Sequence, residues 1–367
     1  MNQKHSTDLL EKSLSGEFLN NDEILHLYKF ADFNELAFYA DLIRKKYHPD
    51  NIVTYIIDRN INYTNICYSQ CKFCNFCRKP HDHDVYVLEL KDYKSKIDEL
   101  YSLGGRQILL QGGMNPKLDL EYYQSLFKQL KKSYPDIKLH ALGPPEIVFL
   151  ANKSKKSIRQ VLEILIEAGL DSLPGAGAEI LCDRVRNIIS PAKCSSAEWL
   201  EVMKIAQEIG LTTSATMMFG HIETMDERVE HLLKIRELQN KKPNHSKGFI
   251  SFTPWPFAKS GTKLVKEYPF IPDVSAIEFL RIIALSRIVL LNIPNIQVSW
   301  LTMGAQVASL ALHCGANDMS SIMIEENVVS QAGKNFKLDE DAMKKAISEA
   351  GFIPRRRNQQ YEILNEF

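Results

Sequence analysis

From Val53 onward, short apolar runs alternate with amphipathic helical segments, and this alternation limits the possible folds more than any other feature. Strands that alternate with helices form parallel βαβ units. We expect eight strands, near 53–58, 107–111, 137–142, 170–174, 212–219, 248–254, 296–300 and 314–319. We expect helices near 91–103, 119–133, 157–168, 196–209, 225–239, 275–291, 302–312 and 339–350. The pattern predicts an α/β fold with a closed or nearly closed (β/α)8 barrel of the TIM type, and an open doubly wound sheet is the alternative.

The beginning of the chain has a different pattern. Apolar residues recur there at helical spacing in three segments, 8–15, 22–29 and 34–46. His48-Pro49-Asp50 ends the last of them. We therefore expect a helical N-terminal extension over residues 1–50. One barrel domain with a C-terminal helical segment is expected over 51–367.

The charge and hydropathy of the sequence limit the classes of binding partner that we expect. Lys and Arg total 45, as do Asp and Glu, so the formal net charge is zero. A balanced charge removes the usual electrostatic reason to expect nucleic acid or an anionic membrane as partner. The first residues lack the apolar core of a signal peptide, and the apolar stretch 277–293 is interrupted by charged and polar residues. We expect a cytoplasmic protein with no nucleic-acid and no membrane partner.

Four of the seven cysteines lie within eleven residues, at 67, 71, 74 and 77. Such crowding favours metal or cluster ligation over a disulfide framework. Cys67, Cys71 and Cys74 form CxxxCxxC. Three thiolates can hold three irons of a 4Fe–4S cluster and leave the fourth open to a small chelating molecule. The alternative is a zinc site that also uses Cys77, but structural zinc sites usually join two separated ligand pairs.

The CxxxCxxC spacing, with Phe73 before the last cysteine and its place after the first barrel strand, resembles the radical S-adenosylmethionine (SAM) signature. Other strands end in small or polar residues, at 111–113, 143–145, 175–177 and 219–221. Barrels of this kind place their chemistry in the loops at the carboxyl ends of the strands.

Over roughly residues 50–360 the sequence also resembles the cyclic dehypoxanthine futalosine synthase family. The matching segments are 62–76, 110–113, 140–146, 170–181, 183–186, 189–191, 198–200, 215–224, 298–300, 315–318 and 323–329. Two sister families share most of the pattern, aminofutalosine synthase and the deazaflavin-forming synthase subunit. Thr253-Pro254-Trp255 fits the cyclase better than aminofutalosine synthase, and 176–179 fits it better than the deazaflavin enzyme. The sequence departs from the family pattern at Cys77 and Asn115.

The resemblance implies an activity and its cofactors. A 4Fe–4S cluster and SAM would generate a 5′-deoxyadenosyl radical, which would cyclise dehypoxanthine futalosine to cyclic dehypoxanthine futalosine in menaquinone biosynthesis. Flavodoxin or ferredoxin would be a suitable electron donor. A sister radical SAM activity is one alternative, and a non-catalytic zinc-binding protein is another.

The barrel and the resemblance together suggest roles for individual side chains. For SAM the expected contacts are Gln111, Gly112, Gly113, Glu179 and Arg184, with Arg186 as an alternative to Arg184. For proton transfer they are His221 and Glu223, with a structural histidine as the alternative. For the substrate they are His140, Glu146, Asn317 and Asp318. Ring stacking or core packing is expected for Trp255 and Trp300, core packing for Met217, Met218 and Met323, and a solvated loop for 81–84.

Overall fold

The structure is a computed structural model that describes residues 2–325, 327, 330–333 and 336–364. The segment 323–329, used above for the family resemblance, lies partly outside these residues. The strands are β1 (Ile52–Ile56), β2 (Asp58–Asn62), β3 (Gln107–Gln111), β4 (Lys138–Ala141), β5 (Ser172–Leu173), β6 (Thr212–Phe219), β7 (Phe249–Pro256), β8 (Asn295–Ile296), β9 (Asp318–Ser321) and β10 (Ile353–Arg356).

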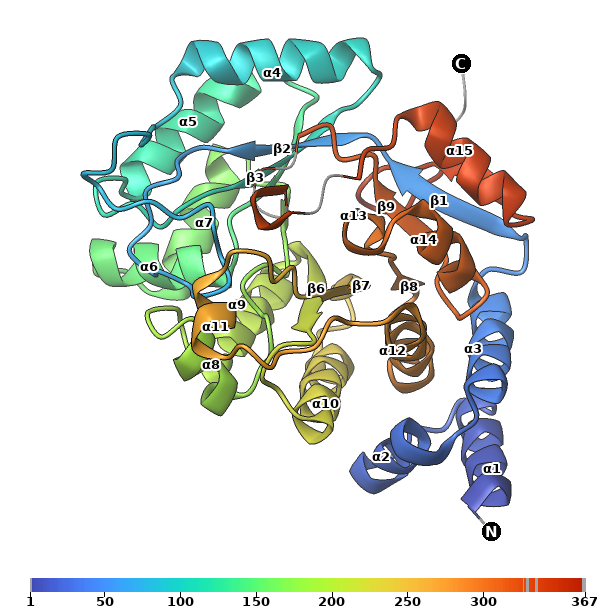
Figure 1. Ribbon diagram of the computed structural model, residues 1–367. Coiled ribbons are helices and arrows are strands. Elements are labelled where there is room, and N and C mark those ends of the chain that lie inside the picture. Colours follow the sequence, from blue (N-terminus) through green and yellow to red (C-terminus); the bar gives the residue numbers. More distant parts are fainter. Residues whose placement is uncertain (1, 326, 328–329, 334–335, 365–367) are drawn as a thin grey trace.

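The helices surround the strands (Figure 1). They are α1 (Asn2–Leu14), α2 (Asn21–Phe30), α3 (Phe33–Tyr47), α4 (Leu90–Ser102), α5 (Leu120–Ser133), α6 (Pro144–Ser154), α7 (Ile158–Ala168), α8 (Asp183–Ile189), α9 (Ser196–Ile209), α10 (Met225–Lys241), α11 (Lys263–Glu267), α12 (Ala276–Val289), α13 (Trp300–Met303), α14 (Ala305–Leu312) and α15 (Glu340–Glu349).

The strands form a ring. β2 to β8 make a seven-stranded parallel sheet in chain order, and β1 lies between β9 and β10 in a second sheet. Only Ile57 separates β1 from β2, so one extended segment runs through both sheets. On the other side, Val298 N donates to Asp318 O at 2.9 Å and Asn317 N donates to Ile296 O at 3.1 Å, which joins the β8 segment to β9. The expected barrel is confirmed, with β10 added beside β1.

The apolar core lies between the strands and the helices. On β3, Ile108 and Leu110 are fully buried, whereas the alternate residue Leu109 faces the barrel interior. The three N-terminal helices pack beside α12 and α10, as Figure 1 also shows. Among the described residues, no helix is both long and apolar enough to cross a membrane.

Several expected boundaries were wrong. The segment 302–312 is two helices, α13 and α14, because Gly304 adopts a φ of +82° between them. The strand expected at 296–300 ends at Ile296. Six elements in the described residues were not expected: β2, α6, α8, α11, the 3-10 helix Ser330–Ala332 and β10. α6 begins at Pro144, since proline suits the first turn of a helix, and the Glu146 side chain accepts from Gly143 N.

Candidate functional site

A cavity of about 400 Å³ runs inside the barrel, and we call it the barrel cavity. On β2 the alternate residues Asp58, Asn60 and Asn62 all line it. β6 and β7 likewise contribute Ser214, Thr216, Ser251 and Thr253. A TIM barrel usually fills its interior with branched apolar side chains, so polar residues here keep the centre open for a ligand. Polar residues at every second position of a strand are the signal by which this cavity could have been predicted from the sequence.

All three cysteines of CxxxCxxC line the cavity. Ser69 Oγ lies 2.9 Å from Cys67 Sγ and 3.4 Å from Cys71 Sγ, and Met114 N donates to Cys67 Sγ at 3.3 Å. A hydrogen bond with Cys77 lowers the pKa of Cys67 to about 5; burial opposes this shift and Ser69 supports it. Hydroxyl and amide donors directed at thiolate sulfurs are typical of iron–sulfur sites. These contacts therefore fit a 4Fe–4S cluster in which each of the three thiolates would bind one iron.

The cysteine loop is anchored by the backbone. Lys72 N donates to Ile189 O at 2.8 Å, and Leu264 N donates to Lys72 O at 2.8 Å. Cys77, which also lines the cavity, lies with its Sγ 3.3 Å from Cys67 O. Among the described residues, no group of three or more His, Cys, Asp or Glu side chains is placed to hold a single metal ion.

Gln111, Gly112 and Gly113, the residues expected from the sequence to contact SAM, line the cavity next to this loop. A Cβ on Gly113 would lie 2.1 Å from Ile66 O, and one on Gly112 would lie 2.9 Å from the Tyr63 ring. Gly113 is therefore needed for the close approach of the β3 end to the backbone before Cys67, and Gly112 is needed for the packing of this end against Tyr63.

Glu179 also lines the cavity, and it is buried with a φ of +47°. Its Oε1 accepts from Lys193 Nζ at 2.8 Å. Burial opposes the charge of Lys193, but nearby Cys71 and Glu179 outweigh it and raise the lysine pKa. Lys193 was not expected from the sequence, because nothing distinguishes it from the other basic residues until folding places it beside Glu179.

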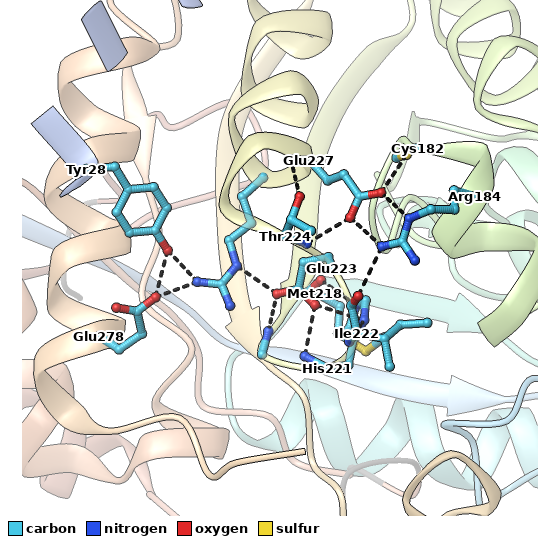
Figure 2. Close-up of polar contacts among 12 residues, drawn as sticks. Tyr28, Cys182, Arg184, Met218, His221, Ile222, Glu223, Thr224, Glu227 and Glu278 are labelled. Atoms are coloured by element: carbon cyan, nitrogen blue, oxygen red, sulfur yellow. Dashed lines mark hydrogen bonds and ion pairs between the residues drawn. The ribbon is translucent and has the colours of Figure 1, made fainter. Parts of the chain in front are cut away.

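The structure does not bring Arg184 into the cavity. Its Nε and Nη2 both donate to the Glu227 carboxylate at 2.6 Å, and its side chain is 51% exposed (Figure 2). Arg186, the alternative candidate, is buried. It donates to the carbonyls of Ala178 at 2.5 Å and Cys194 at 2.6 Å. Arg186 therefore holds the segment that carries Glu179.

His221 and Glu223 belong to a buried network that does not line the cavity (Figure 2). His221 Nε2 lies 3.1 Å from Met218 O, and its Nδ1 lies 2.9 Å from Glu223 Oε2. Glu223 Oε1 accepts from Gly220 N at 2.6 Å and from Arg228 Nε at 2.7 Å. Arg228 also contacts Glu278 and Tyr28. The network connects the loop after β6 to α12 and the N-terminal α2.

His140 and Glu146 do line the cavity. His140 Nδ1 lies 2.7 Å from Ser172 Oγ, and burial with the charge of Arg357 lowers its pKa to about 3. His140 is therefore neutral at physiological pH. Burial raises the pKa of Glu146 to about 7, which is the range where a carboxyl exchanges protons efficiently.

Asn317 and Asp318 do not line the cavity. Asn317 Oδ1 accepts from Arg287 Nη2 at 2.7 Å and from Ile296 N at 2.9 Å, so it helps to close the ring. Asp318 is fully buried and pairs with Arg357 at 2.5 Å. Both residues thus support the barrel wall.

The remaining sequence candidates divide as follows. Trp255 lines the cavity, whereas Trp300 is buried and donates from Nε1 to Ser321 O at 2.8 Å. Met217 and Met218 are fully buried, which confirms their core role. Met323 is partly buried and packs against the core as expected, and it also lines the cavity. In the segment 81–84, Asp84 is exposed and pairs with Arg78.

The segment after β10 was not expected at the site. Arg357 and Gln359 line the cavity. Gln359 Oε1 accepts from Gln107 Nε2 at 3.0 Å, and Gln360 Oε1 accepts from Thr212 Oγ1 at 3.2 Å. Gln107 and Thr212 begin β3 and β6. This segment therefore crosses the amino end of the barrel, opposite the cysteine loop.

The sequence profile of the radical SAM superfamily matches residues 61–235, and that of the CofH/MqnC C-terminal region matches 246–366. The chain is 39% identical to the cyclic dehypoxanthine futalosine synthase of Halalkalibacterium halodurans over 98% of this chain and 95% of the relative. The same enzyme of Streptomyces coelicolor is 39% identical over 97% and 88%. The chain belongs to the radical SAM superfamily.

A second group of relatives has a different name. The 5-amino-6-(D-ribitylamino)uracil–L-tyrosine 4-hydroxyphenyl transferase of Methanothermobacter thermautotrophicus is 36% identical over the full length of both chains. Among solved structures, methylornithine synthase has a TM-score of 0.70 at 18% identity and covers 95% of this chain and 97% of its own. The FeFe-hydrogenase maturase of Carboxydothermus hydrogenoformans has a TM-score of 0.73 at 17% identity, with 98% and 81% covered. Both likenesses show the fold.

This radical SAM enzyme uses a 4Fe–4S cluster and SAM, the cofactors of its superfamily. The cluster would be held by Cys67, Cys71 and Cys74. The membership excludes the non-catalytic zinc-binding protein considered above. When bound, the two cofactors supply a 5′-deoxyadenosyl radical, and the protein contributes binding, orientation and exclusion of water.

Proposed function

We propose that this radical SAM enzyme cyclises dehypoxanthine futalosine to cyclic dehypoxanthine futalosine. The observation that carries the proposal is the chemistry of the barrel cavity. Among the described residues that line it, uncharged hydroxyl and amide side chains outnumber the charged ones, and three of the five charged side chains are paired, Lys193 with Glu179 and Arg357 with Asp318. Such a wall suits the hydroxyls of a ribose, and two relatives with 39% identity over nearly the whole chain carry the name of this cyclase.

The second candidate is transfer of the 4-hydroxyphenyl group of tyrosine to 5-amino-6-(D-ribitylamino)uracil, which the transferase relatives support. That reaction needs two separate molecules, one of which carries an ammonium and a carboxylate. The two futalosine relatives share 39% identity with this chain and the Methanothermobacter transferase shares 36%. Identity alone gives little separation, and both substrates carry hydroxyls, so the activity assay below decides between the two reactions.

The residues of the cavity have distinct tasks in the proposed reaction. Trp255 lines the cavity and offers a flat face to the aromatic ring of the substrate. Neutral His140 hydrogen-bonds the ribose without adding charge. Glu146, with its pKa raised to about 7, accepts the proton released when the ring regains aromaticity. Gln111, Gly112 and Gly113 contact SAM at the end of β3.

An anaerobic assay tests the proposal. Cluster-loaded enzyme receives SAM, a reductant such as reduced flavodoxin, and dehypoxanthine futalosine. We expect the cyclic product and one 5′-deoxyadenosine per turnover. A parallel reaction contains tyrosine and 5-amino-6-(D-ribitylamino)uracil instead. Product from the second mixture alone would replace the cyclase with the transferase.

A further inference from the structure

Asn60, at the centre of β2, has a hydrogen-bond acceptor that the protein leaves unused. The side chain lines the barrel cavity and is only 6% exposed. Among the described residues, no donor reaches its Oδ1. Its neighbour at the next inward position, Asn62, differs: Asn62 Nδ2 donates to Gln111 O at 3.2 Å, and Asn62 Oδ1 accepts from Asn327 Nδ2 at 3.0 Å.

Gln107, at the start of the adjacent β3, has the same feature. It lines the cavity, is 4% exposed, and its Oε1 has no donor among the described residues. Its Nε2 donates to Asp58 Oδ2 at 3.2 Å and to Gln359 Oε1 at 3.0 Å. Two acceptors on one nitrogen identify Nε2 as the amide nitrogen, so the unused atom is the carbonyl oxygen.

The two carbonyls belong to one wall. In the register of β2 and β3, Asp58 lies opposite Gln107 and Asn60 lies opposite Leu109. Gln107 and Asn60 therefore stand on successive inward levels of neighbouring strands. A buried acceptor without a donor is unfavourable, and folded proteins seldom keep one without a reason. Two on one cavity wall point to a ligand that brings its own donors.

We infer that Asn60 Oδ1 and Gln107 Oε1 accept hydrogen bonds from two hydroxyl groups of the substrate, which makes this wall of the barrel cavity a polyol subsite. The inference rests on the proposed function for the identity of the polyol, the ribose of dehypoxanthine futalosine. Gln359 acts as a positioning residue, because its hydrogen bond with Gln107 Nε2 turns the free carbonyl away from the segment after β10.

Asn60→Leu tests the inference, since leucine has nearly the shape of asparagine and lacks the acceptor. Removing an unsatisfied buried acceptor should leave the thermal unfolding midpoint unchanged or raise it. The matched control is Asn62→Leu, which removes two made hydrogen bonds and should lower the midpoint. A purely structural Asn60 would behave like Asn62.

Binding is the second measurement. Anaerobic calorimetry uses cluster-loaded enzyme with SAM and no reductant, so that no turnover occurs. We expect Asn60→Leu to weaken binding of dehypoxanthine futalosine about tenfold. We also compare analogues of dehypoxanthine futalosine that each lack one ribose hydroxyl. One of these analogues should bind the wild-type enzyme about tenfold more weakly than dehypoxanthine futalosine does. The Asn60→Leu variant should bind that analogue and dehypoxanthine futalosine equally well. Unchanged affinity in Asn60→Leu, or equal discrimination of every analogue by both proteins, would overturn the inference.

Failure of the proposed function gives a different result. If the activity assay yields only the transferase product, the calorimetry is repeated with 5-amino-6-(D-ribitylamino)uracil, whose ribityl chain also carries hydroxyls. Weaker binding of that molecule by Asn60→Leu would support the polyol subsite, although the cyclase assignment would be wrong. Equal binding by both proteins would remove the subsite as well.

Discussion

Lys193 Nζ lies 2.8 Å from Glu179 Oε1, and both side chains line the barrel cavity beside the cysteine loop. The side chain of Lys193 is 14% exposed and that of Glu179 is 6% exposed. A pair so well shielded from water depends on both partners, because either charge alone would be left in a poorly solvating environment.

Lys193→Met should therefore be strongly destabilising. We expect a loss of about 3 kcal/mol in the free energy of unfolding, measured by urea denaturation of the cluster-free protein. Lys204→Met serves as the control, since Lys204 pairs with Glu201 at the surface and should change stability by no more than about 0.5 kcal/mol. Equal effects of the two substitutions would contradict the buried pair.

Alanine variants of the four clustered cysteines should differ in the iron that they bind. Alanine at Cys67, Cys71 or Cys74 should prevent stable reconstitution and abolish 5′-deoxyadenosine formation, because each thiolate would hold a different iron. Cys77→Ala should keep about four irons per chain. Iron and sulfide analysis after anaerobic reconstitution measures this. Loss of the cluster in Cys77→Ala would make Cys77 a ligand and the open iron would disappear.

Arg184→Ala should have little effect on the binding of SAM. Its guanidinium is held by Glu227 outside the barrel cavity, so we expect the KM for SAM to stay within about twofold of wild type. The ion pair is half-exposed, and its loss should reduce the free energy of unfolding by at most about 1 kcal/mol. A tenfold rise in KM would instead support the SAM contact expected from the sequence.

Glu223 should produce an acid-dependent loss of stability. Burial alone would raise its pKa, but His221 and Arg228 outweigh it and lower the pKa to about 2. A depressed pKa means that the stabilisation is complete above the unfolded-state value near 4.5 and is lost as pH falls toward 2. The lowered pKa of Glu223 corresponds to a contribution of about 3 kcal/mol to the free energy of unfolding.

Urea unfolding of wild type and Glu223→Gln between pH 6 and about pH 2.5 measures this contribution. The difference in free energy of unfolding between the two proteins should be largest at pH 6 and should shrink below about pH 4.5. A difference independent of pH would show that Glu223 acts through hydrogen bonds alone.

Local patterns predicted most of the fold. Alternation of strands and helices is set by neighbouring residues, so the barrel and its N-terminal helices were predictable. The cavity positions of Glu146 and Glu179 followed from strand ends. His221 and Glu223 also follow a strand, but their side chains turn into a network with Arg228, and Asn317 and Asp318 bind Arg287 and Arg357. Arg228 is only five residues from Glu223, whereas Arg287 and Arg357 lie 30 and 39 residues from their partners. None of these pairings could be inferred from the strand ends.

By itself the sequence determined the cysteine loop and the order of the barrel units, because both depend on spacing within a few residues or on short periodic segments. Only the tertiary structure decided which polar side chains share the cavity. Lys193 meets Glu179 from the other side of α8, and Gln359 reaches Gln107 from the far end of the chain. The unused carbonyls of Asn60 and Gln107 were equally hidden, since whether a buried polar atom has a partner depends on every strand around it.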